Sequence, residues 1–228
     1  MRQSDAHYKR EQAFWDEKGN TDYKSLSAYD QKRLLGWLDW KGNGRALDLG
    51  GGSGMLSRLL TTVAGSECVC MDISGKMLRY SSVPAVQADA LKLPFAGGSF
   101  DLVVAAAFFH HIPGQETNLM RECRRVLSAT GRLVGYDPNA HCIQNRIFMT
   151  SSPLRLGLFS PDERPIRPEL LKQQALLAAF SEFSFHTFSF RNERMTAFEF
   201  VQRYALNPFA VGPLQKYLDR WFFWSARR

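Results

Sequence analysis

The sequence lacks the apolar runs that mark membrane and secreted proteins. No stretch approaches the roughly 20 consecutive apolar residues that a membrane-spanning helix needs. The N-terminal segment MRQSDAHYKREQAFW is polar and charged, and no apolar run follows its basic residues, so it does not resemble a secretory signal. We therefore expect a cytoplasmic protein without a transmembrane segment, and leave peripheral contact with a membrane open.

Cysteine is scarce, and its spacing argues against disulfide and metal sites. The 4 cysteines are Cys68, Cys70, Cys123 and Cys142, and none of them form a C-x-x-C pair. Two of them lie inside an apolar, strand-like run, which predicts buried free thiols. No metal site is expected.

A concentrated block of one charge is also missing. The net charge is +7, but the 29 basic residues are spread along the chain and interleaved with 22 acidic ones, which disfavours nucleic acid as a partner. Hydrophobic residues make up 45% of the chain and charged residues 22%, a balance typical of globular proteins. A length of 228 residues suits a single α/β domain with appendages.

Short apolar runs alternate with helical segments through the middle of the chain. This alternation predicts βαβ units around a parallel sheet, and the nearly continuous apolar runs predict strands that are covered on both faces. The predicted strands are residues 46–50, 68–73, 85–89, 101–107 and 132–137, and the predicted helices are 55–63, 75–82 and 116–127.

The pattern becomes irregular after residue 138. A long segment without clear periodicity, such as 138–168, often forms a lid or binding wall. Beyond it we expect a helix at 168–180, a strand at 183–190, a helical stretch at 196–220 broken at NPFAVGP, and a final strand, WFFWSARR.

The sharpest local feature is a glycine-rich loop, ALDLGGGSG, at the end of the first predicted strand. Glycines there allow a tight turn and let a ligand lie against bare backbone. The dinucleotide fingerprint G-x-G-x-x-G would need glycine at Met55, and no G-K-[ST] follows as a phosphate-binding P-loop requires. A pyrophosphate or nucleoside triphosphate is therefore disfavoured.

Three acids follow three successive strands. Asp48, Asp72 and Asp89 stand at or near strand ends, where ligands bind in open parallel sheets. A carboxylate at Asp72 can accept hydrogen bonds from both hydroxyls of a ribose. An acidic rim suits an uncharged nucleoside or a cationic ligand better than phosphates, although each acid alone could simply cap a turn or helix.

These motifs resemble those of the class I S-adenosylmethionine-dependent methyltransferases, in the small-molecule group that includes ubiquinone and menaquinone biosynthesis enzymes. ALDLGGGSG is similar to D-x-G-x-G-x-G, CVCMDIS to the second-strand acidic motif, QADALKLPFAGGSFDLVV to D-A-x-x-L-P-F with F-D-x-V, and RVLSATGRL to R-V-L-x-x-G-G-x-L. The resemblance covers residues 45–139. It implies a Rossmann-like three-layer sandwich with a seven-stranded, mostly parallel sheet, in which FSFHTFSF and WFFWSARR supply the final pair and the last strand is antiparallel.

The same resemblance implies a binding site for S-adenosylmethionine. The glycines would pass close to the methionine moiety, Asp48 would support the loop and Asp72 would bind the ribose. Asp89 and Ala90 would meet adenine, and Met77 would lie against its ring or belong to the core. The implied cofactor-binding set is Asp48, Gly50, Gly51, Gly52, Gly54, Asp72, Ile73, Met77, Asp89, Ala90 and Ala106.

Methyl transfer needs an acceptor lone pair or carbanion held close to the methyl group, and a group that removes the acceptor's proton. Candidate bases follow the fourth and fifth strands: His110 and His111 in FFHHIP, and Asp137 in YDPNAH. A histidine titrates near neutrality, as a general base should. Alternatively, the histidines anchor their loop and Asp137 caps a turn.

The acceptor is expected to be a small molecule, a lipid or a sugar. Amino methylases of DNA bases and of glutamine carry [DN]-P-P-[YF] after the fourth strand, where this chain has AAAFFHHI.

We expect one domain over residues 1–228, with a helical cap at 1–44, a cofactor-binding core at 45–139, and an acceptor-side cover with the final strand pair at 140–228. The alternatives are a non-catalytic S-adenosylmethionine-binding module and a nucleotide-dependent oxidoreductase.

Overall fold

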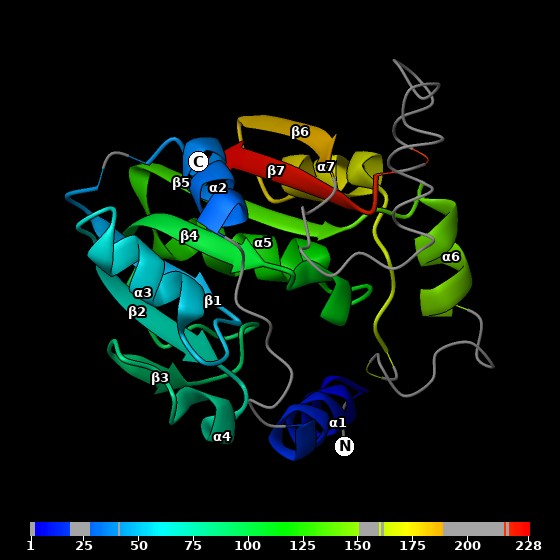
Figure 1. The fold of residues 1–228 in the computed structure, drawn as a ribbon, viewed down its shortest axis with the longest axis horizontal. Helices are drawn as coiled ribbons and strands as arrows, with labels where there is room; N and C mark the ends of the chain where they lie inside the picture. Colours follow the sequence, from blue (N-terminus) through cyan, green and yellow to red (C-terminus); the bar gives the residue numbers. More distant parts are fainter. Residues whose placement is uncertain are drawn as a thin grey trace.

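The computed structural model describes residues 3–18, 28–40, 42–150, 160, 162–188, 217 and 219–228. Within them lies a 7-stranded sheet with the order β3-β2-β1-β4-β5-β7-β6 (Figure 1). Strands β1 to β5 run parallel, whereas β7 is antiparallel to both β5 and β6. This topology confirms the predicted fold. The strands are β1 (Arg45–Leu49), β2 (Glu67–Asp72), β3 (Ala85–Gln87), β4 (Phe100–Ala106), β5 (Leu127–Pro138), β6 (Glu182–Phe188) and β7 (Trp221–Arg227).

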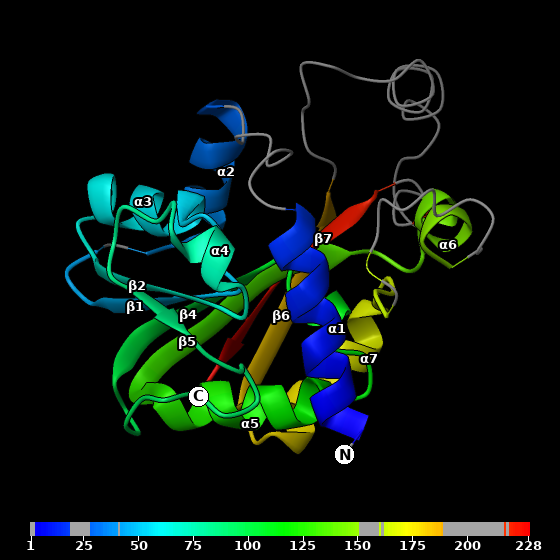
Figure 2. The same cartoon turned by 90° about the horizontal axis from the view of Figure 1, so that it is seen from below.

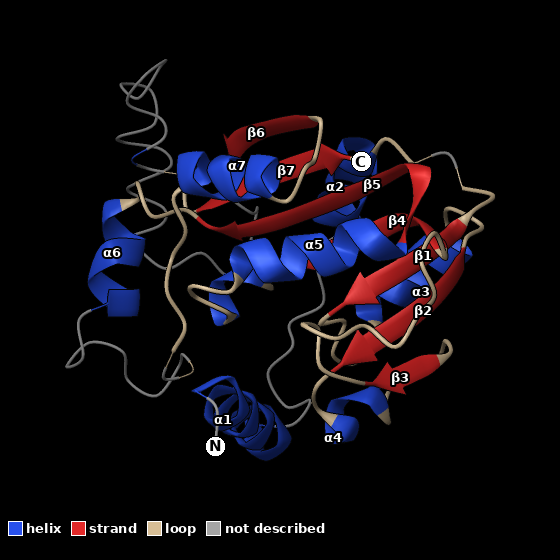
Figure 3. Ribbon diagram, turned by 180° about the vertical axis from the view of Figure 1, so that it is seen from behind, coloured by secondary structure: helices blue, strands red, loops and turns tan. Residues whose placement is uncertain are grey.

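Helices cover both faces of the sheet. Figure 2 shows α2 and α3 on one side of it and α5 with α7 on the other, and Figure 3 shows α5 and α7 lying across β4, β5 and β7. The helices are α1 (Gln3–Lys18), α2 (Ala28–Leu38), α3 (Met55–Thr62), α4 (Gly75–Leu78), α5 (Glu116–Val126), α6 (Ile143–Thr150) and α7 (Pro168–Leu177), and a 3₁₀ turn, η1, spans Phe109–His111.

The alternation of side chains along the strands divides the core into two layers. In β4, Val103 and Ala105 join the cluster beneath α5 and α7, while Leu102 and Val104 join the cluster beneath α3. Both faces of such a strand are removed from water, which explains its continuous apolar sequence. Trp224 of β7 fills the first layer, with its ring 5.0 Å from that of Phe109.

The predicted buried thiols are confirmed. All four cysteines are free and buried. Burial raises the pKa of Cys68 and of Cys70 to about 12, so both thiols stay protonated at neutral pH.

The structure differs from the expected elements at several points. The segment expected to be irregular contains α6, and β5 already begins at Leu127, directly after α5, pairing there with Phe100 before a register shift. The helix expected at 75–82 is only the single turn of α4. Most of the helical stretch expected at 196–220 lies outside the described residues. No helix among the described residues is long and apolar enough to cross a bilayer.

Candidate active site

The glycine loop leaves β1 and turns sharply into α3. The backbone N–H groups of Gly50 and Gly51 both donate to the carbonyl of Met71, at 2.8 and 3.0 Å, which fastens the loop to the end of β2. Gly50, Gly52 and Gly54 have positive φ angles of 69°, 55° and 76°. Residues with a side chain rarely adopt positive φ angles, so the loop needs glycine at these three positions.

There is also no space for a side chain at Gly50. A Cβ atom there would lie 2.1 Å from Cδ2 of Phe108. We expect Gly50→Ala to lower the free energy of unfolding by about 1–3 kcal/mol, through backbone strain and displacement of the ring, and to weaken binding of S-adenosylhomocysteine. Urea unfolding and calorimetry measure the two effects.

The matched control is Gly65→Ala. Gly65 has a similar φ of 67°, but a Cβ atom there meets nothing within 4 Å. Gly65→Ala should lower the free energy of unfolding only through backbone strain, and it should bind S-adenosylhomocysteine as tightly as the wild type. An equal loss of affinity in both variants would contradict the steric argument at Gly50.

The three acids at the strand ends have different surroundings. Asp48 is buried under the loop, where its Oδ2 accepts a hydrogen bond of 2.6 Å from Ser57 Oγ, and burial raises its pKa to about 6. Asp72 accepts N–H bonds from Gly52 at 2.9 Å and Ser74 at 2.8 Å, and burial raises its pKa. Asp89 accepts one from Leu91 at 2.8 Å. Asp48 therefore braces β1 against α3, while Asp72 fixes the loop.

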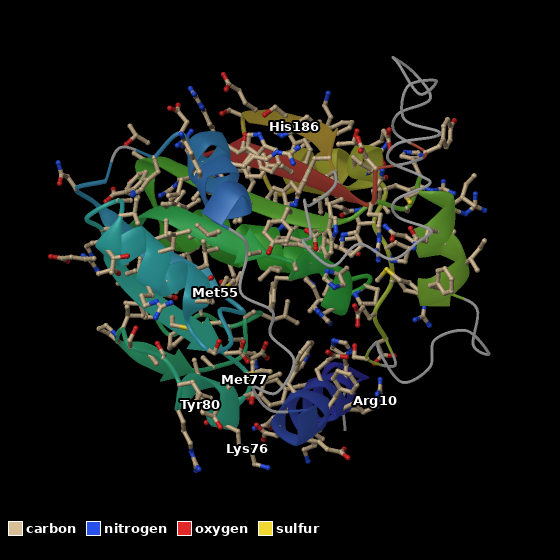
Figure 4. All side chains as sticks on the ribbon, viewed as in Figure 1. Arg10, Met55, Lys76, Met77, Tyr80 and His186 are labelled. Carbon is tan, nitrogen blue, oxygen red and sulfur yellow. The ribbon has the colours of Figure 1, made fainter. Side chains whose placement is uncertain are left out.

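A single cavity opens at these strand ends, with a volume of about 880 Å³ including the part open to solvent. It is lined by eight of the residues predicted for the site: Gly50, Gly52, Asp72, Ile73, Met77, Asp89, Ala90 and His111. The other six do not line it: Asp48, Gly51, Gly54, Ala106, His110 and Asp137. In Figure 4, Met77 of α4 lies toward the sheet, while Lys76 of α4 and Tyr80, which follows the helix, lie on its outer side. Ala107 lines the cavity in place of its neighbour Ala106.

Helix α1 forms a wall that the sequence analysis did not assign to the site. His7, Glu11 and Trp15 recur at every fourth residue, and all three line the cavity together with Tyr8. Asp16 accepts a hydrogen bond of 2.6 Å from Ser74 Oγ, which fastens α1 to the start of α4. The sequence predicted a helical cap at 1–44, and the four-residue spacing indicated one helix face, but the residues that this face contacts were not predicted.

His110 lies between two carboxylates, away from the cavity. Its Nδ1 is 2.9 Å from Asp137 Oδ1 and its Nε2 is 3.1 Å from Glu163 Oε1. Although burial lowers the pKa of His110, these two hydrogen bonds raise it to about 9, so the ring is an imidazolium at neutral pH. Trp224 Nε1 donates to the other oxygen of Asp137 at 2.9 Å. The structure therefore does not favour His110 or Asp137 as a base, because both ring nitrogens and both carboxylate oxygens are engaged.

His111 has the opposite surroundings. It lines the cavity, its Nδ1 lies 3.4 Å from Glu11 Oε2, and the edge of Trp15 packs against its ring at 5.4 Å. Of the three candidate bases, His111 is the one that can reach a molecule in the cavity.

Two groups of possible metal ligands lie beside the cavity, and both contain internal ion pairs. His110, His111 and Glu163 form one group, and His7, Glu11 and Asp162 form the other. In the second, Arg10 Nη2 lies 2.8 Å from Asp162 and already supplies a cation; Arg10 is labelled on α1 in Figure 4.

The fold, the glycine loop and the acid at the end of β2 resemble those of class I S-adenosylmethionine-dependent methyltransferases, and comparison with known proteins agrees with this resemblance. Residues 47–135 match the family described as a methyltransferase domain. An S-adenosylmethionine-dependent methyltransferase from Archaeoglobus fulgidus has the same fold, with a TM-score of 0.66 at 20% identity over 88% of this chain and 93% of that one.

The nearer sequence relatives carry more particular names. The chain is 36% identical over 131 residues to a demethylmenaquinone methyltransferase from Thermotoga maritima, covering 52% of this chain and 57% of that protein. It is 29% identical over 131 residues to the 27-O-demethylrifamycin SV methyltransferase of Amycolatopsis mediterranei, covering 53% and 47%. The matched segments thus span about half of these relatives. The chain therefore resembles the S-adenosylmethionine-dependent methyltransferases, the quinone methylases among them.

Proposed function

We propose that this protein transfers the methyl group of S-adenosylmethionine to a small, largely apolar acceptor held in the cavity. The observation that carries the proposal is one cavity lined by two of the positive-φ glycines, by Asp72 and by His111, at the carboxyl ends of β1, β2 and β4. In open α/β sheets, ligands bind at this edge. Bound S-adenosylmethionine would supply a methyl group already activated by its sulfonium charge.

The residues present fit this cofactor. In the proposal Asp72 accepts the ribose hydroxyls, while Asp89 and the backbone of Ala90 meet adenine and Met77 and Ile73 pack against it. Gly50, Gly51, Gly52 and Gly54 form the turn that leaves room for the methionine moiety. Asp48 and Ala106 do not line the cavity and would support the residues that do. Helix α1, as part of a cap formed by residues 1–44, covers the cofactor.

Apolar and aromatic side chains support the acceptor half of the proposal. Trp15, Leu91, Phe108 and Ile112 line the cavity, and apolar contact of this kind binds flat or lipid-like compounds. Two relatives are named for demethylmenaquinone and for 27-O-demethylrifamycin SV, respectively. Arg146, Arg164 and Arg167 are exposed and do not line this cavity, so they do not supply it with an anion-binding group.

A screen for release of S-adenosylhomocysteine tests the proposal. The purified protein is incubated with S-adenosylmethionine and three sets of probes: neutral hydroxyl compounds (1,4-dihydroxynaphthalene and catechol), amines (histamine and phosphoethanolamine), and a quinol lacking its ring methyl group. We expect turnover of at least one probe and micromolar binding of S-adenosylhomocysteine by calorimetry, with no binding of NAD or NADP. Binding without turnover of any probe would favour a non-catalytic module, and binding of NAD would favour an oxidoreductase.

A further inference from the structure

We infer that Glu11 and His111 form a proton-accepting dyad at the acceptor end of the cavity, and that the acceptor presents a hydroxyl group to it. This inference rests on the proposed function and assigns the step that removes the acceptor's proton. Helix α1 supplies the carboxylate and η1 supplies the imidazole, so the dyad exists only when α1 lies against the end of β4.

The carboxylate of Glu11 is held beside the His111 ring by its surroundings. Glu11 is only 4% exposed, and its Oε2 accepts a hydrogen bond of 3.3 Å from Trp15 Nε1. The same oxygen lies 3.4 Å from His111 Nδ1. Its second oxygen, Oε1, is buried and has no hydrogen-bond partner among the described residues. A buried carboxylate oxygen without a donor is costly, and a donor brought by a ligand would relieve that cost.

The geometry assigns the two nitrogens of His111 different tasks. With Nδ1 facing Glu11, a proton on Nδ1 is stabilised by the carboxylate, and Nε2 keeps a lone pair for the cavity. His111 Nδ1 is itself buried without a hydrogen-bond partner among the described residues, so at 3.4 Å it is in ion-pair contact with Glu11 and not hydrogen-bonded to it. Trp15 packs its edge against the imidazole and limits its rotation.

Charged groups of both signs surround His111. Glu11 faces it from α1, Glu163 lies beyond His110, and Asp72 is close enough to interact electrostatically. His7 of α1 and the His110 imidazolium are the other titratable groups nearby. The three carboxylates attract the positive charge that His111 carries after it has taken the acceptor's proton, and the His110 cation repels it.

The proposed step balances without any further reactant. His111 Nε2 takes the hydroxyl proton as the acceptor oxygen forms a bond to the methyl carbon. The bond between that carbon and sulfur breaks, and its electron pair stays on sulfur. The products are the O-methylated acceptor, neutral S-adenosylhomocysteine and protonated His111, which later releases its proton to water.

The same residues restrict the acceptor to compounds without an anionic group near the reacting oxygen. Glu11, Asp72 and Asp89 all line the cavity as acids and would repel a phosphate or carboxylate. Among the described residues, neither Lys nor Arg lines the cavity to offset this repulsion. A neutral phenol or alcohol with an apolar body satisfies both the acids and the aromatic wall.

The first test is independent of any acceptor. Long-range ¹H–¹⁵N spectra of the ¹⁵N-labelled full chain report the tautomer and titration of each of the 5 histidines, and His111→Asn identifies the signal of His111. We expect His111 to carry its neutral-state proton on Nδ1. In Glu11→Gln the population with its proton on Nε2 should rise, because the variant lacks the negative charge that stabilises a proton on Nδ1.

The matched control is Glu17→Gln, which removes an exposed carboxylate from the same helix and should leave the tautomer of His111 unchanged. Glu11→Asp keeps the charge and should retain most of the Nδ1 tautomer. A proton on Nε2 in the wild type, or a tautomer that does not respond to Glu11→Gln, would overturn the dyad.

The second test uses turnover and separates this inference from the proposed function. Turnover of 1,4-dihydroxynaphthalene or catechol should fall 10²-fold or more in kcat for His111→Asn, while S-adenosylhomocysteine still binds as in the wild type. Turnover of amine or C–H probes alone would overturn the acceptor class and leave methyl transfer intact. Absence of S-adenosylhomocysteine binding in the wild type would instead remove the proposed function itself.

Discussion

Replacement of Asp72 by alanine is expected to reduce the affinity for S-adenosylhomocysteine by about 10²–10³-fold, or about 3–4 kcal/mol, because hydrogen bonds to a charged group contribute roughly 1.5–3 kcal/mol each. The carboxylate already accepts N–H bonds from Gly52 and Ser74, so the variant loses both the proposed ribose contacts and the restraint on the glycine loop. Calorimetric titration of the folded variant measures the loss.

Asp101→Ala is the matched control. Asp101 is also a strand aspartate with two hydrogen bonds, from the Arg45 N–H at 3.1 Å and Ser128 Oγ at 2.9 Å, but it lies near the start of β4 and does not line the cavity. It should lower stability without affecting affinity. If Asp72→Ala binds as tightly as Asp101→Ala, Asp72 does not bind the ribose.

Replacement of His110 by alanine is expected to lower the free energy of unfolding by about 3–5 kcal/mol, because it leaves two buried carboxylates without their shared cation. Asp137 is 0% exposed and Glu163 is 7% exposed, so water cannot easily replace the imidazole. For a chain of this size each kcal/mol corresponds to about 2–4 °C in Tm, so thermal unfolding should shift by roughly 6–20 °C.

This stabilisation should depend on pH in a defined direction. Because the pKa of His110 is raised from 6.5 to about 9, its contribution is fully present below pH 6.5 and is lost as the pH rises toward 9. Although burial raises the pKa of Glu163, its hydrogen bond from His110 lowers it from 4.5 to about 2, so its contribution is lost as the pH falls from 4.5 toward 2. The stability difference between wild type and His110→Ala should therefore be largest between pH 4.5 and 6.5 and narrow toward pH 9.

The control for this effect is His141→Ala. His141 also pairs with a glutamate, Glu169, at 2.8 Å, but the glutamate side chain is 56% exposed. An exposed pair contributes about 1 kcal/mol or less, so this variant should unfold close to the wild type. Equal losses in the two histidine variants would show that the buried ion pairs of His110 do not determine its effect.

The sequence predicted those features that depend on residues close together in the chain. Apolar runs predicted the strands of the sheet, and FSFHTFSF with WFFWSARR predicted the pair β6 and β7. The site residues were harder to predict, because the side chains of adjacent residues can point to opposite sides of a turn. His110 and His111 look equivalent in FFHHIP, yet η1 directs one into a buried ion network and the other into the cavity.

The contribution of α1 could not be predicted for a different reason. Glu11 meets His111 across 100 positions of sequence, and the four-residue spacing of His7, Glu11 and Trp15 identifies a helix face without identifying what it covers. Likewise, Glu163 follows a segment without periodicity, and its partnership with His110 depends on where β4 and β5 end. Contacts between distant segments of this kind are set by the assembled fold.

The position of β7 also constrains the order in which the sheet can be assembled. Residues 221–227 pair with β5 on one side and β6 on the other, so β6 has no place in the sheet until they have been synthesised. Trp224 completes the hydrogen bonds of Asp137 from the same strand. On the ribosome, a nascent chain can pair β1 to β5 early, but the second oxygen of Asp137 gains its donor only when Trp224, 87 residues further along the chain, has been made. Closure of this sheet therefore depends on residues 221–227, which join β6 to the strands made before it.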